Sequence, residues 1–384
     1  MNKVVGYKLF MVPPRWLFLS VGTEDGVVGW GEPVLEGRAR TVAAAVSELM
    51  DKYVLGTDAS NIEGTWQLLY RGGFYRGGPI LMSAISGIDQ ALWDIKGKTL
   101  GVPVYDLLGG TCRNAVRVYH WVGGDSPSEV SEQALELIEK GFTAVKMNIA
   151  GRLHSIESSH KVKEITDRVA QVRGAIGDKV DIAIDFHGRV TAAMAPRLAR
   201  ALEPYSLLFM EEPILPAIPS RLAQLKASST IPIAFGERLY TRWGFRPFLE
   251  SGVLDVAQPD ISHAGGISEC KKIGSLMETH GGQVAFHCPL GPIALASCIQ
   301  VAATLPNYLI QEASFGMHYN EGIEITDYLE DASVFNVSDG FIALPTAPGL
   351  GIVVDEDAVR DASIKGHDWA NPVWRHEDGA LSEW

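Results

Sequence analysis

Two different hydrophobic patterns divide the chain near residue 115. In the first part, two apolar runs flank Asp25-Gly26, a pair that predicts a β-hairpin. Between about 41 and 110 the apolar residues instead follow the spacing of helix faces. One such face contains Ile85, Ile88, Leu92 and Ile95. The first part therefore predicts a few strands followed by helices.

After residue 115, helical segments alternate with short apolar runs of strand length. Some helical segments end in a glycine, such as Gly141 and Gly177, that is followed directly by such a run, which is typical of βα units. The runs are 116–119, 143–146, 180–185, 207–210, 231–235, 253–257, 283–286 and 308–310. Eight parallel strands with intervening helices predict a βα barrel. A doubly wound open sheet is the alternative, although no glycine-rich phosphate loop follows the first run.

The residues that follow these runs carry most of the candidate chemistry. Ionisable side chains end seven successive runs: Lys146, Asp185, Glu211, Glu237, Asp260, His287 and Glu312. The last six are spaced 23 to 27 residues apart, about the length of a strand, a helix and two loops. In a barrel every strand ends at the same mouth, so these side chains are expected to converge. A single ionisable residue after a strand is more often a helix cap. Seven such residues at the ends of seven successive runs are not expected by coincidence.

Two groups within this set indicate specific chemistry. Asp185, Glu211 and Glu237 would repel one another without a cation, and their oxygens are the ligands that Mg²⁺ prefers. One Mg²⁺ per subunit is therefore expected. Asp260 and His287 end neighbouring strands and would form a dyad, in which the carboxylate fixes the imidazole tautomer and raises its basicity.

Further polar residues extend the predicted mouth. His187 follows Asp185 by two positions, and Asn148 follows Lys146 by two, so each pair points to one side of its strand. Cationic side chains near the mouth would suit an anionic substrate. The candidates for substrate contacts near these strand ends are Lys146, Asn148, Arg189 and Arg238, and the family resemblance given below adds Arg15.

Composition narrows the range of partners. The chain has 384 residues, of which 46% are hydrophobic, enough for a large core. Its 46 acidic and 33 basic residues give a net charge of −13, and it has no Lys/Arg block. This balance argues against nucleic acid and anionic membranes as partners. A homo-oligomer is compatible with the sequence.

The expected location is the cytoplasm. Four cysteines without C-x-x-C spacing are typical of a reduced compartment. The N-terminal segment lacks the pattern of a signal peptide. The most apolar run, 291–306, contains polar residues and is too short to predict a membrane span.

Motifs along nearly the whole chain resemble the enolase superfamily, in its mandelate-racemase-like branch. Within that branch they resemble the sugar-acid dehydratases, most closely those that act on D-galactonate. The motifs lie at 14–16, 30–33, 36–40, 70–78, 91–98, 107–110, 185–189, 258–266, 287–292 and 371–379. The segment 149–159 matches least.

The resemblance implies a modified TIM-type (β/α)7β barrel with an α+β capping domain. The barrel, the catalytic domain, would span 116–335. The cap would combine residues 1–115 with the C-terminal segment 336–384. Its loops would close the mouth and select among substrates.

The resemblance also implies roles for individual residues. Asp185, Glu211 and Glu237 match the Mg²⁺ ligands. His287 matches the base that removes the proton from C2 of the sugar acid, and Asp260 matches its partner.

His187 matches the acid that protonates the departing 3-hydroxyl, and Glu312 matches a residue that stabilises the enolate oxygen. Asn148 departs from the pattern, because many members of the branch have a second, basic lysine at this position. The departure leaves His287 as the sole base and disfavours racemase chemistry, which needs a base on both faces.

The implied reaction is dehydration of a sugar acid to its 2-dehydro-3-deoxy product, with D-galactonate as the favoured substrate. A gluconate- or mannonate-type dehydratase of the same superfamily is one alternative. A non-catalytic binding or structural protein of this fold is another, although a full set of ligands, acid and base argues against it.

Overall fold

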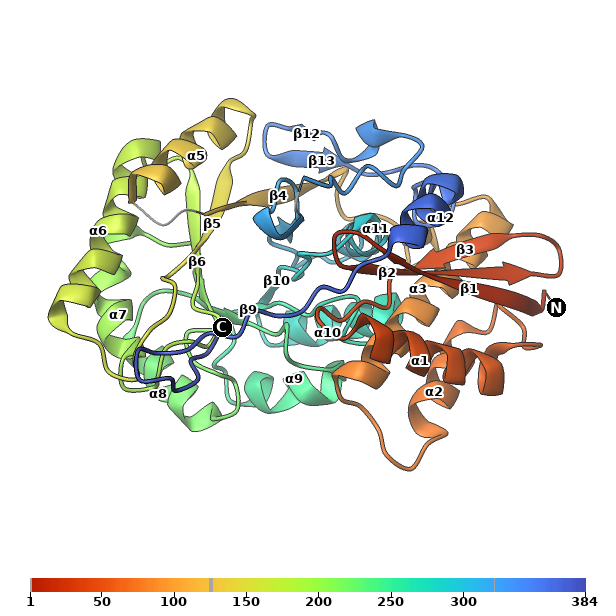
Figure 1. Ribbon diagram of the computed structural model, residues 1–384, viewed down its shortest axis with the longest axis horizontal. Helices are drawn as coiled ribbons and strands as arrows, with labels where there is room; N and C mark the ends of the chain where they lie inside the picture. Colours follow the sequence, from red (N-terminus) through yellow and green to blue (C-terminus); the bar gives the residue numbers. More distant parts are fainter. Residues whose placement is uncertain (1, 124–126, 321) are drawn as a thin grey trace.

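The chain forms a barrel with a smaller cap beside it (Figure 1). The structure, a computed structural model, describes residues 2–123, 127–320 and 322–384. The cap sheet is antiparallel and consists of β1 (Val4–Val12), β2 (Trp16–Thr23) and β3 (Val28–Gly31). The helices beside it are α1 (Ala39–Leu49), a π-helical turn (Met50–Val54), α2 (Ile62–Arg71), α3 (Pro79–Leu100), α4 (Val104–Leu107) and α12 (Glu356–Lys365).

The predicted hairpin and the predicted helix are both present. Gly26, at φ = +85°, makes the turn between β2 and β3, a conformation that glycine adopts without strain. Helix α3 crosses β3 at close range. A Cβ on Gly31 would lie 1.9 Å from the carbonyl oxygen of Gly87, so glycine is required at this crossing. The close approach lets α3 pack directly on the cap sheet.

Eight parallel strands form the barrel. They are β4 (Ala115–Val122), β5 (Ala144–Asn148), β6 (Asp181–Asp185), β7 (Phe209–Glu211), β8 (Ile233–Phe235), β9 (Val256–Ala257), β10 (Gln283–Val284) and β11 (Gln311–Glu312). Neighbouring strands pair in chain order from β4 to β10. A parallel bridge from Val284 to Tyr308 and the pairing of β11 with β4 close the ring. The predicted barrel is confirmed, and this order excludes the doubly wound sheet.

The eighth strand begins later than the sequence predicts. The apolar run at 308–310 contributes the bridge to β10, whereas β11 itself starts at Gln311. Two further strands, β12 (Val337–Ser338) and β13 (Phe341–Ala343), form a hairpin that adds to β4 in the antiparallel sense. The division of the chain into domains at 115 and 335 stays a prediction.

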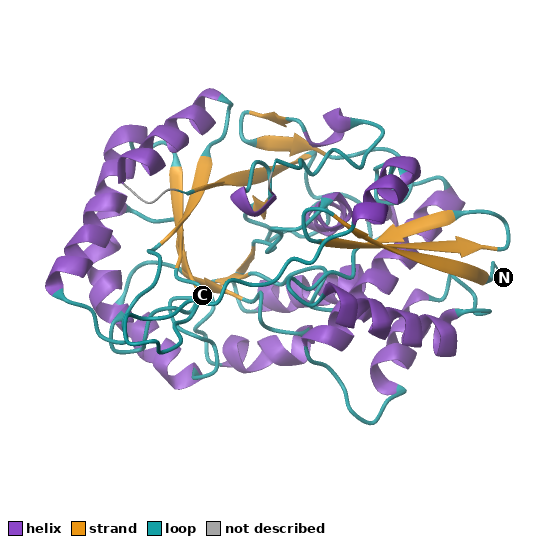
Figure 2. Cartoon of the chain, in the orientation of Figure 1, coloured by secondary structure: helices purple, strands orange, loops and turns teal. Residues whose placement is uncertain are grey.

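Helices surround the strands (Figure 2). One helix follows each strand from β4 to β10, in the (β/α)7β order. These are α5 (Pro127–Glu139), α6 (Ser159–Ile176), α7 (Ala195–Leu202), α8 (Pro219–Ser228), α9 (Thr241–Glu250), α10 (Gly266–Thr279) and α11 (Pro292–Ala302). Short 3₁₀ turns occur at Glu203–Tyr205, His318–Asn320 and Ala332–Phe335.

The barrel interior is a packed core. One buried side chain from each strand or its flanking residue contributes to it: Tyr119, Ala144, Ala183, Phe209, Ala234, Val256, Ala285 and Ile310. Because these side chains fill the ring, polar chemistry is confined to the ends of the strands.

The C-terminal tail, residues 366–384, follows α12 and runs across the face of the barrel in Figure 1. It starts beside the cap, where a ring nitrogen of His367 lies 3.1 Å from the carbonyl oxygen of Trp16. Across the described part of the chain, none of the helices has the length and apolar character to cross a membrane.

Candidate active site

The strand-end residues that the sequence selected lie at one end of the barrel. Asp185, Glu211 and Glu312 are the last residues of β6, β7 and β11. A parallel bridge joins Asp260 to His287 beyond β9 and β10. The side chains therefore meet although they are scattered over the sequence.

Asp185, Glu211 and Glu237, here named the rim carboxylates, each place an oxygen within 4.8 Å of the others. Among the described residues, none donates a hydrogen bond to Asp185 Oδ2, Glu211 Oε1 or Glu237 Oε2, although these atoms are buried. Burial, opposed by Lys146 and reinforced by neighbouring carboxylates, raises the pKa of Asp185 to about 6 and that of Glu211 to about 8. Buried oxygens with this much uncompensated charge fit a hard divalent cation such as Mg²⁺.

Lys146 lies among the carboxylates, fully buried. Its Nζ is 2.8 Å from Glu211 Oε2, 2.9 Å from Glu312 Oε1 and 3.6 Å from Asp185 Oδ2. It also lies 4.6 Å from the centre of the Trp121 ring. Burial lowers the pKa of Lys146, but the surrounding carboxylates outweigh this and raise it well above the usual value. The ammonium group therefore partly balances the negative charge of the rim.

Asp260 and His287 form the expected pair. His287 Nδ1 lies 2.7 Å from Asp260 Oδ2, while Asp260 Oδ1 accepts a hydrogen bond from the Ser262 backbone N–H at 2.7 Å. The bond to Nδ1 leaves Nε2 facing the mouth, 3.5 Å from Glu237 Oε2. Burial lowers the pKa of His287, but Glu237, Glu312 and Asp260 together raise it well above its ordinary value.

His187 lies on the other side of the mouth. Three strands separate its strand, β6, from β10 in either direction round the barrel. Its backbone N–H donates to Asp185 Oδ1 at 2.7 Å, and its ring stacks on Trp121 with centroids 6.0 Å apart. Burial, together with the nearby charges of Arg189 and Lys146, lowers the pKa of His187 well below the usual value.

Glu312 is bonded on both carboxylate oxygens. Oε1 accepts from Trp121 Nε1 at 2.6 Å and lies beside Lys146, while Oε2 accepts from the backbone N–H of Cys288 at 2.8 Å. Burial raises the pKa of Glu312, but the charges of Lys146 and His287 outweigh it and lower the pKa overall. These contacts favour the ionised carboxylate.

Two arginines follow the rim strands. Arg238 Nε lies 3.2 Å from Glu212 Oε2, and its Nη2 donates to the His187 carbonyl at 3.1 Å. Arg189 donates to the Ala150 carbonyl at 2.8 Å, and its guanidinium lies 4.7 Å from the ring centre of Trp374 in the tail. Both cations are therefore partly engaged by the protein.

The two remaining candidates come from opposite parts of the fold. Arg15, in the cap, donates to Glu36 at 2.8 Å and to the carbonyl of Pro289 at 2.7 Å. It ties the cap to the loop that follows His287. Asn148 ends β5 beside Asp185, and in the described chain its buried Oδ1 receives no hydrogen bond.

Two family models match the chain. The one described as mandelate racemase / muconate lactonizing enzyme, N-terminal domain, covers residues 12–109. The one described as enolase C-terminal domain-like covers residues 129–358. The chain belongs to the enolase superfamily. The predicted family is therefore confirmed.

Relatives of this enolase-superfamily chain match it over its full length. A protein of Ralstonia nicotianae named D-galactonate dehydratase is 52% identical over 382 residues, covering 100% of both chains. A protein of Pectobacterium atrosepticum with the same name is 51% identical over 383 residues, covering 100% of this chain and 99% of its own.

Solved structures of the superfamily share the fold. A mandelate racemase/muconate lactonizing enzyme from Sulfitobacter sp. superposes with a TM-score of 0.90 at 32% identity, covering 98% of this chain and 99% of its own. A member of the enolase superfamily from Salmonella Typhimurium gives 0.86 at 30% identity, covering 94% and 98%. They confirm the predicted barrel with a separate cap.

Sequence reasoning missed a link between the dyad and the cap. His263 is buried, with Nε2 3.6 Å from Asp260 Oδ2 and 3.7 Å from Glu36 Oε2. Its Nδ1 lies 3.0 Å from Ser83 Oγ. Glu36 lies in a motif that the sequence had marked, but its reach to His263 depends on how the cap docks.

Glu212 was also missed, although it directly follows Glu211. Its backbone is left-handed, with φ = +37°, and both carboxylate oxygens are buried. Its one ion pair in the described chain is with Arg238. The doubled glutamate after a strand was the available signal.

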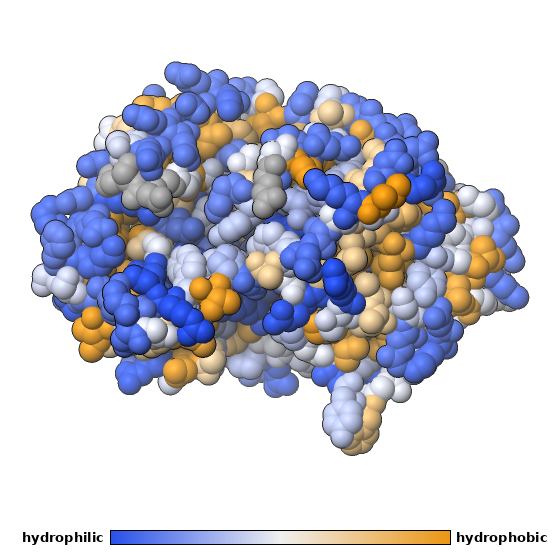
Figure 3. Space-filling view, in the orientation of Figure 1, coloured by the Kyte–Doolittle hydropathy of each residue, from blue (hydrophilic) through white to orange (hydrophobic). Residues whose placement is uncertain are grey.

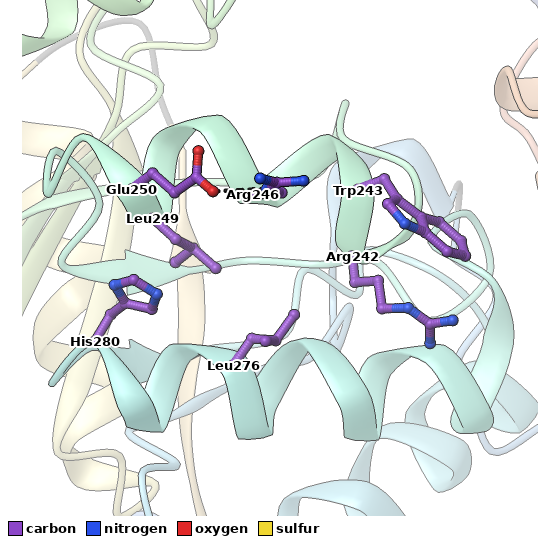
Figure 4. A pocket seen from close by; sticks show the side chains of 7 residues that line it. All are labelled: Arg242, Trp243, Arg246, Leu249, Glu250, Leu276 and His280. Carbon is purple, nitrogen blue, oxygen red and sulfur yellow. Dashed lines mark hydrogen bonds and ion pairs between the residues drawn. The ribbon is translucent and has the colours of Figure 1, made fainter.

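A separate pocket lies between α9 and α10 and has a volume of about 260 Å³ (Figure 4). Its lining consists of Arg242, Trp243, Arg246, Leu249, Glu250, Leu276 and His280. These residues do not overlap with the rim set, so the pocket is distinct from the candidate active site.

Proposed function

We propose that the protein is a Mg²⁺-dependent dehydratase that converts D-galactonate to 2-dehydro-3-deoxy-D-galactonate. The observation that carries the proposal is a pair of histidines on opposite sides of a mouth that also holds the rim carboxylates. The relatives named D-galactonate dehydratase support the choice of substrate.

The rim carboxylates would hold one Mg²⁺ per subunit. Each rim carboxylate has a buried oxygen that accepts no hydrogen bond in the described chain and lies near the other two, and this observation supports the assignment. When bound, the ion supplies positive charge where the deprotonated sugar acid gains negative charge.

His287 is the base in this proposal. Its Nδ1–H is held by Asp260, so Nε2 is free to take the proton from C2. The buried carboxylate stabilises the imidazolium that forms and keeps the ring oriented.

His187 is the acid that gives a proton to the departing 3-hydroxyl. An imidazole whose pKa is lowered is a stronger acid once it is protonated, which suits this step. Since His187 and His287 face each other across the mouth, the proton and the hydroxyl would leave from opposite faces, as an anti elimination.

Glu312 is a positioning residue in this scheme. Its ionised carboxylate holds Lys146 and Trp121, whereas direct donation to an enolate oxygen would need its protonated form. Asn148 offers an unpartnered carboxamide oxygen to a substrate hydroxyl.

Three arginines would bind the rest of the sugar acid: Arg15, Arg189 and Arg238.

The two histidine roles are separated by hydrogen exchange. The substrate is incubated in D₂O with each variant and followed by NMR. His187→Asn keeps the base and the rim, so it is expected to exchange the C2 proton while making little product. His287→Asn is expected to lose both exchange and product.

Exchange by His287→Asn with none by His187→Asn would show that the acid and base are reversed. A parallel screen of sugar acids for 2-keto product tests the substrate. Turnover of gluconate or mannonate in preference to galactonate would show that the proposed substrate is wrong and the proposed reaction is right. Mg²⁺ binding without turnover of any sugar acid would support a non-catalytic protein.

A further inference from the structure

Three potential metal ligands lie together at the surface, outside the rim. His154 is in the loop between β5 and α6, and His376 and Glu377 are in the C-terminal tail. The candidate ligand atoms of the three side chains lie within 4.8 Å of one another. The two imidazole rings stack with centroids 4.5 Å apart, and His154 Nε2 is 3.7 Å from Glu377 Oε2.

The tail presents its two ligands on a tight turn. The backbone N–H of Gly379 donates to the His376 carbonyl at 2.9 Å, and that of His376 donates to the Ala380 carbonyl at 2.8 Å. A bridge between Arg375 and Leu381 closes the turn. His376 Nδ1 is buried, and within the described chain no group bonds to it. The turn therefore fixes the backbone at His376, and one ring nitrogen is left without a hydrogen bond in the described chain.

The apolar side chains on either side of the turn are mostly exposed. Val373 and Leu381 are 70% and 67% exposed, and this face of the molecule is largely hydrophilic (Figure 3). The nearby attachments are polar or aromatic. Arg152 pairs with Glu377, and Arg189 lies under Trp374. Since exposed ion pairs contribute only about 0–1 kcal/mol, the Arg152–Glu377 pair holds the turn weakly, and a bound metal ion would add to it.

We propose that His154, His376 and Glu377 bind a divalent transition-metal ion, with Zn²⁺ as the favoured ion. The bound ion would fasten the C-terminal tail to the loop between β5 and α6, and we name this site the clip. Two imidazoles and one carboxylate, with water completing the shell, form a Zn²⁺ ligand set. The rim carboxylates offer only oxygens and suit Mg²⁺, so the two sites select different ions. The clip site does not depend on the proposed function.

The clip would act on the mouth through the tail. Trp374 covers Arg189, and the terminal Trp384 packs against Tyr319 with ring centroids 5.9 Å apart. Arg15 also lies over the Tyr319 ring, at 5.5 Å. A metal that fixes the tail would therefore hold these aromatic side chains at the edge of the mouth.

Metal stoichiometry is the first test. The full-length protein is held in excess Mg²⁺ to fill the rim, and bound Zn²⁺ is measured by equilibrium dialysis. We expect one Zn²⁺ per chain, lost in His154→Ala and in His376→Ala. It should be retained in His160→Ala, a matched exposed histidine of α6. Retention in Glu237→Gln would show that the rim is not its binding site.

Release of the tail is the second test. Trypsin cuts after Arg375, and mass spectrometry follows the peptide 376–384. At Zn²⁺ ten times above its dissociation constant, cleavage through the undocked tail should slow roughly tenfold, because the ion binds only the docked form. His376→Ala should show no protection.

Equal Zn²⁺ binding by wild type, His154→Ala and His376→Ala would overturn the proposal. So would loss of Zn²⁺ in His160→Ala to the same extent, which would indicate adventitious surface binding. Binding without protection of the tail would reject the clip. None of these readouts uses dehydratase activity, so failure of the clip and failure of the proposed function are distinguishable.

Discussion

Carboxylates are buried in two regions of this protein, at the barrel mouth and at the junction between barrel and cap. Three buried carboxylates of the cap, Glu32, Asp89 and Asp94, are here named the junction carboxylates, and each receives hydrogen bonds on both oxygens. Glu32, for example, accepts from the backbone N–H of Gly291 at 2.7 Å and of Ala294 at 2.9 Å, at the start of α11. Each rim carboxylate, by contrast, keeps a buried oxygen that accepts no hydrogen bond in the described chain.

The two groups of buried carboxylates therefore differ in what their charge does. Glu32 and Asp89 accept hydrogen bonds from the barrel helices α11 and α10, so these two carboxylates join the cap to the barrel. Asp94 instead accepts from Trp30 and Leu350 and joins two segments of the cap. At the rim, charge is concentrated without enough donors, which costs stability but leaves ligand positions open. An unsatisfied buried carboxylate is therefore the better indicator of function.

The largest effect should follow from Glu237→Gln, which removes one rim charge. We expect Mg²⁺ affinity to collapse and kcat/KM to fall roughly 10³-fold, as when a main electrostatic group is lost. The free energy of unfolding in EDTA should change by less than about 1 kcal/mol, because a repelling charge is removed. Calorimetric Mg²⁺ titration, kinetics and urea denaturation measure these quantities. A variant that unfolds easily yet binds Mg²⁺ normally would place Glu237 with the junction carboxylates.

Asp260 is an exception to this contrast. Both of its carboxylate oxygens are hydrogen-bonded, although we assign it to the reaction. Asp260→Asn should lower the rate by about 10²-fold while leaving Mg²⁺ affinity intact. Loss of the carboxylate lowers the pKa of His287, so the acidic limb of the pH–rate profile should move to lower pH. An unmoved limb would reject the dyad.

Asp94→Asn should instead lower the stability of the protein and leave catalysis unchanged. Asp94 accepts from the backbone N–H groups of Trp30 and Leu350, both at 2.9 Å, and from Lys98 at 2.7 Å. The amide would face one of these donors with its own NH₂ group, costing about 2 kcal/mol in the free energy of unfolding. The folded variant should keep its kcat and Mg²⁺ affinity. A drop in kcat with unchanged stability would contradict the structural role.

The rim was predictable because its signal is local. Each rim residue ends an apolar run, and barrel geometry then dictates convergence. For this reason, Asp260 and His287 could be paired from residues 27 apart, as the structure places them. The same reasoning failed at β11, where the apolar run ends before the strand begins.

The junction was not predictable in this way. Glu32 meets α11 across 259 residues, and nothing near it in sequence marks that contact. The sequence placed Lys146 at the end of its strand, whereas β5 continues to Asn148. The pattern also did not indicate that the Lys146 ammonium lies between Glu211 and Glu312. Such contacts depend on side-chain direction and domain docking, which periodicity does not encode.

The most gradual effect expected is a dependence of stability on pH at two of the junction carboxylates. Burial, opposed by hydrogen bonds from Ser268, raises the pKa of Asp89 from 3.8 to about 7. The folded state then holds one more proton than the unfolded state between these values, so stability falls as pH rises through this window and levels off above it. Asp89→Asn removes this titration. Relative to wild type, the variant should gain about 1 kcal/mol per pH unit between pH 5 and 7, measured by urea denaturation. Glu32→Gln should show the same sign up to pH 8, since burial raises the pKa of Glu32 to about 8. A flat difference for both variants would mean that the donors keep these carboxylates ionised throughout, which would make the contrast with the rim sharper still.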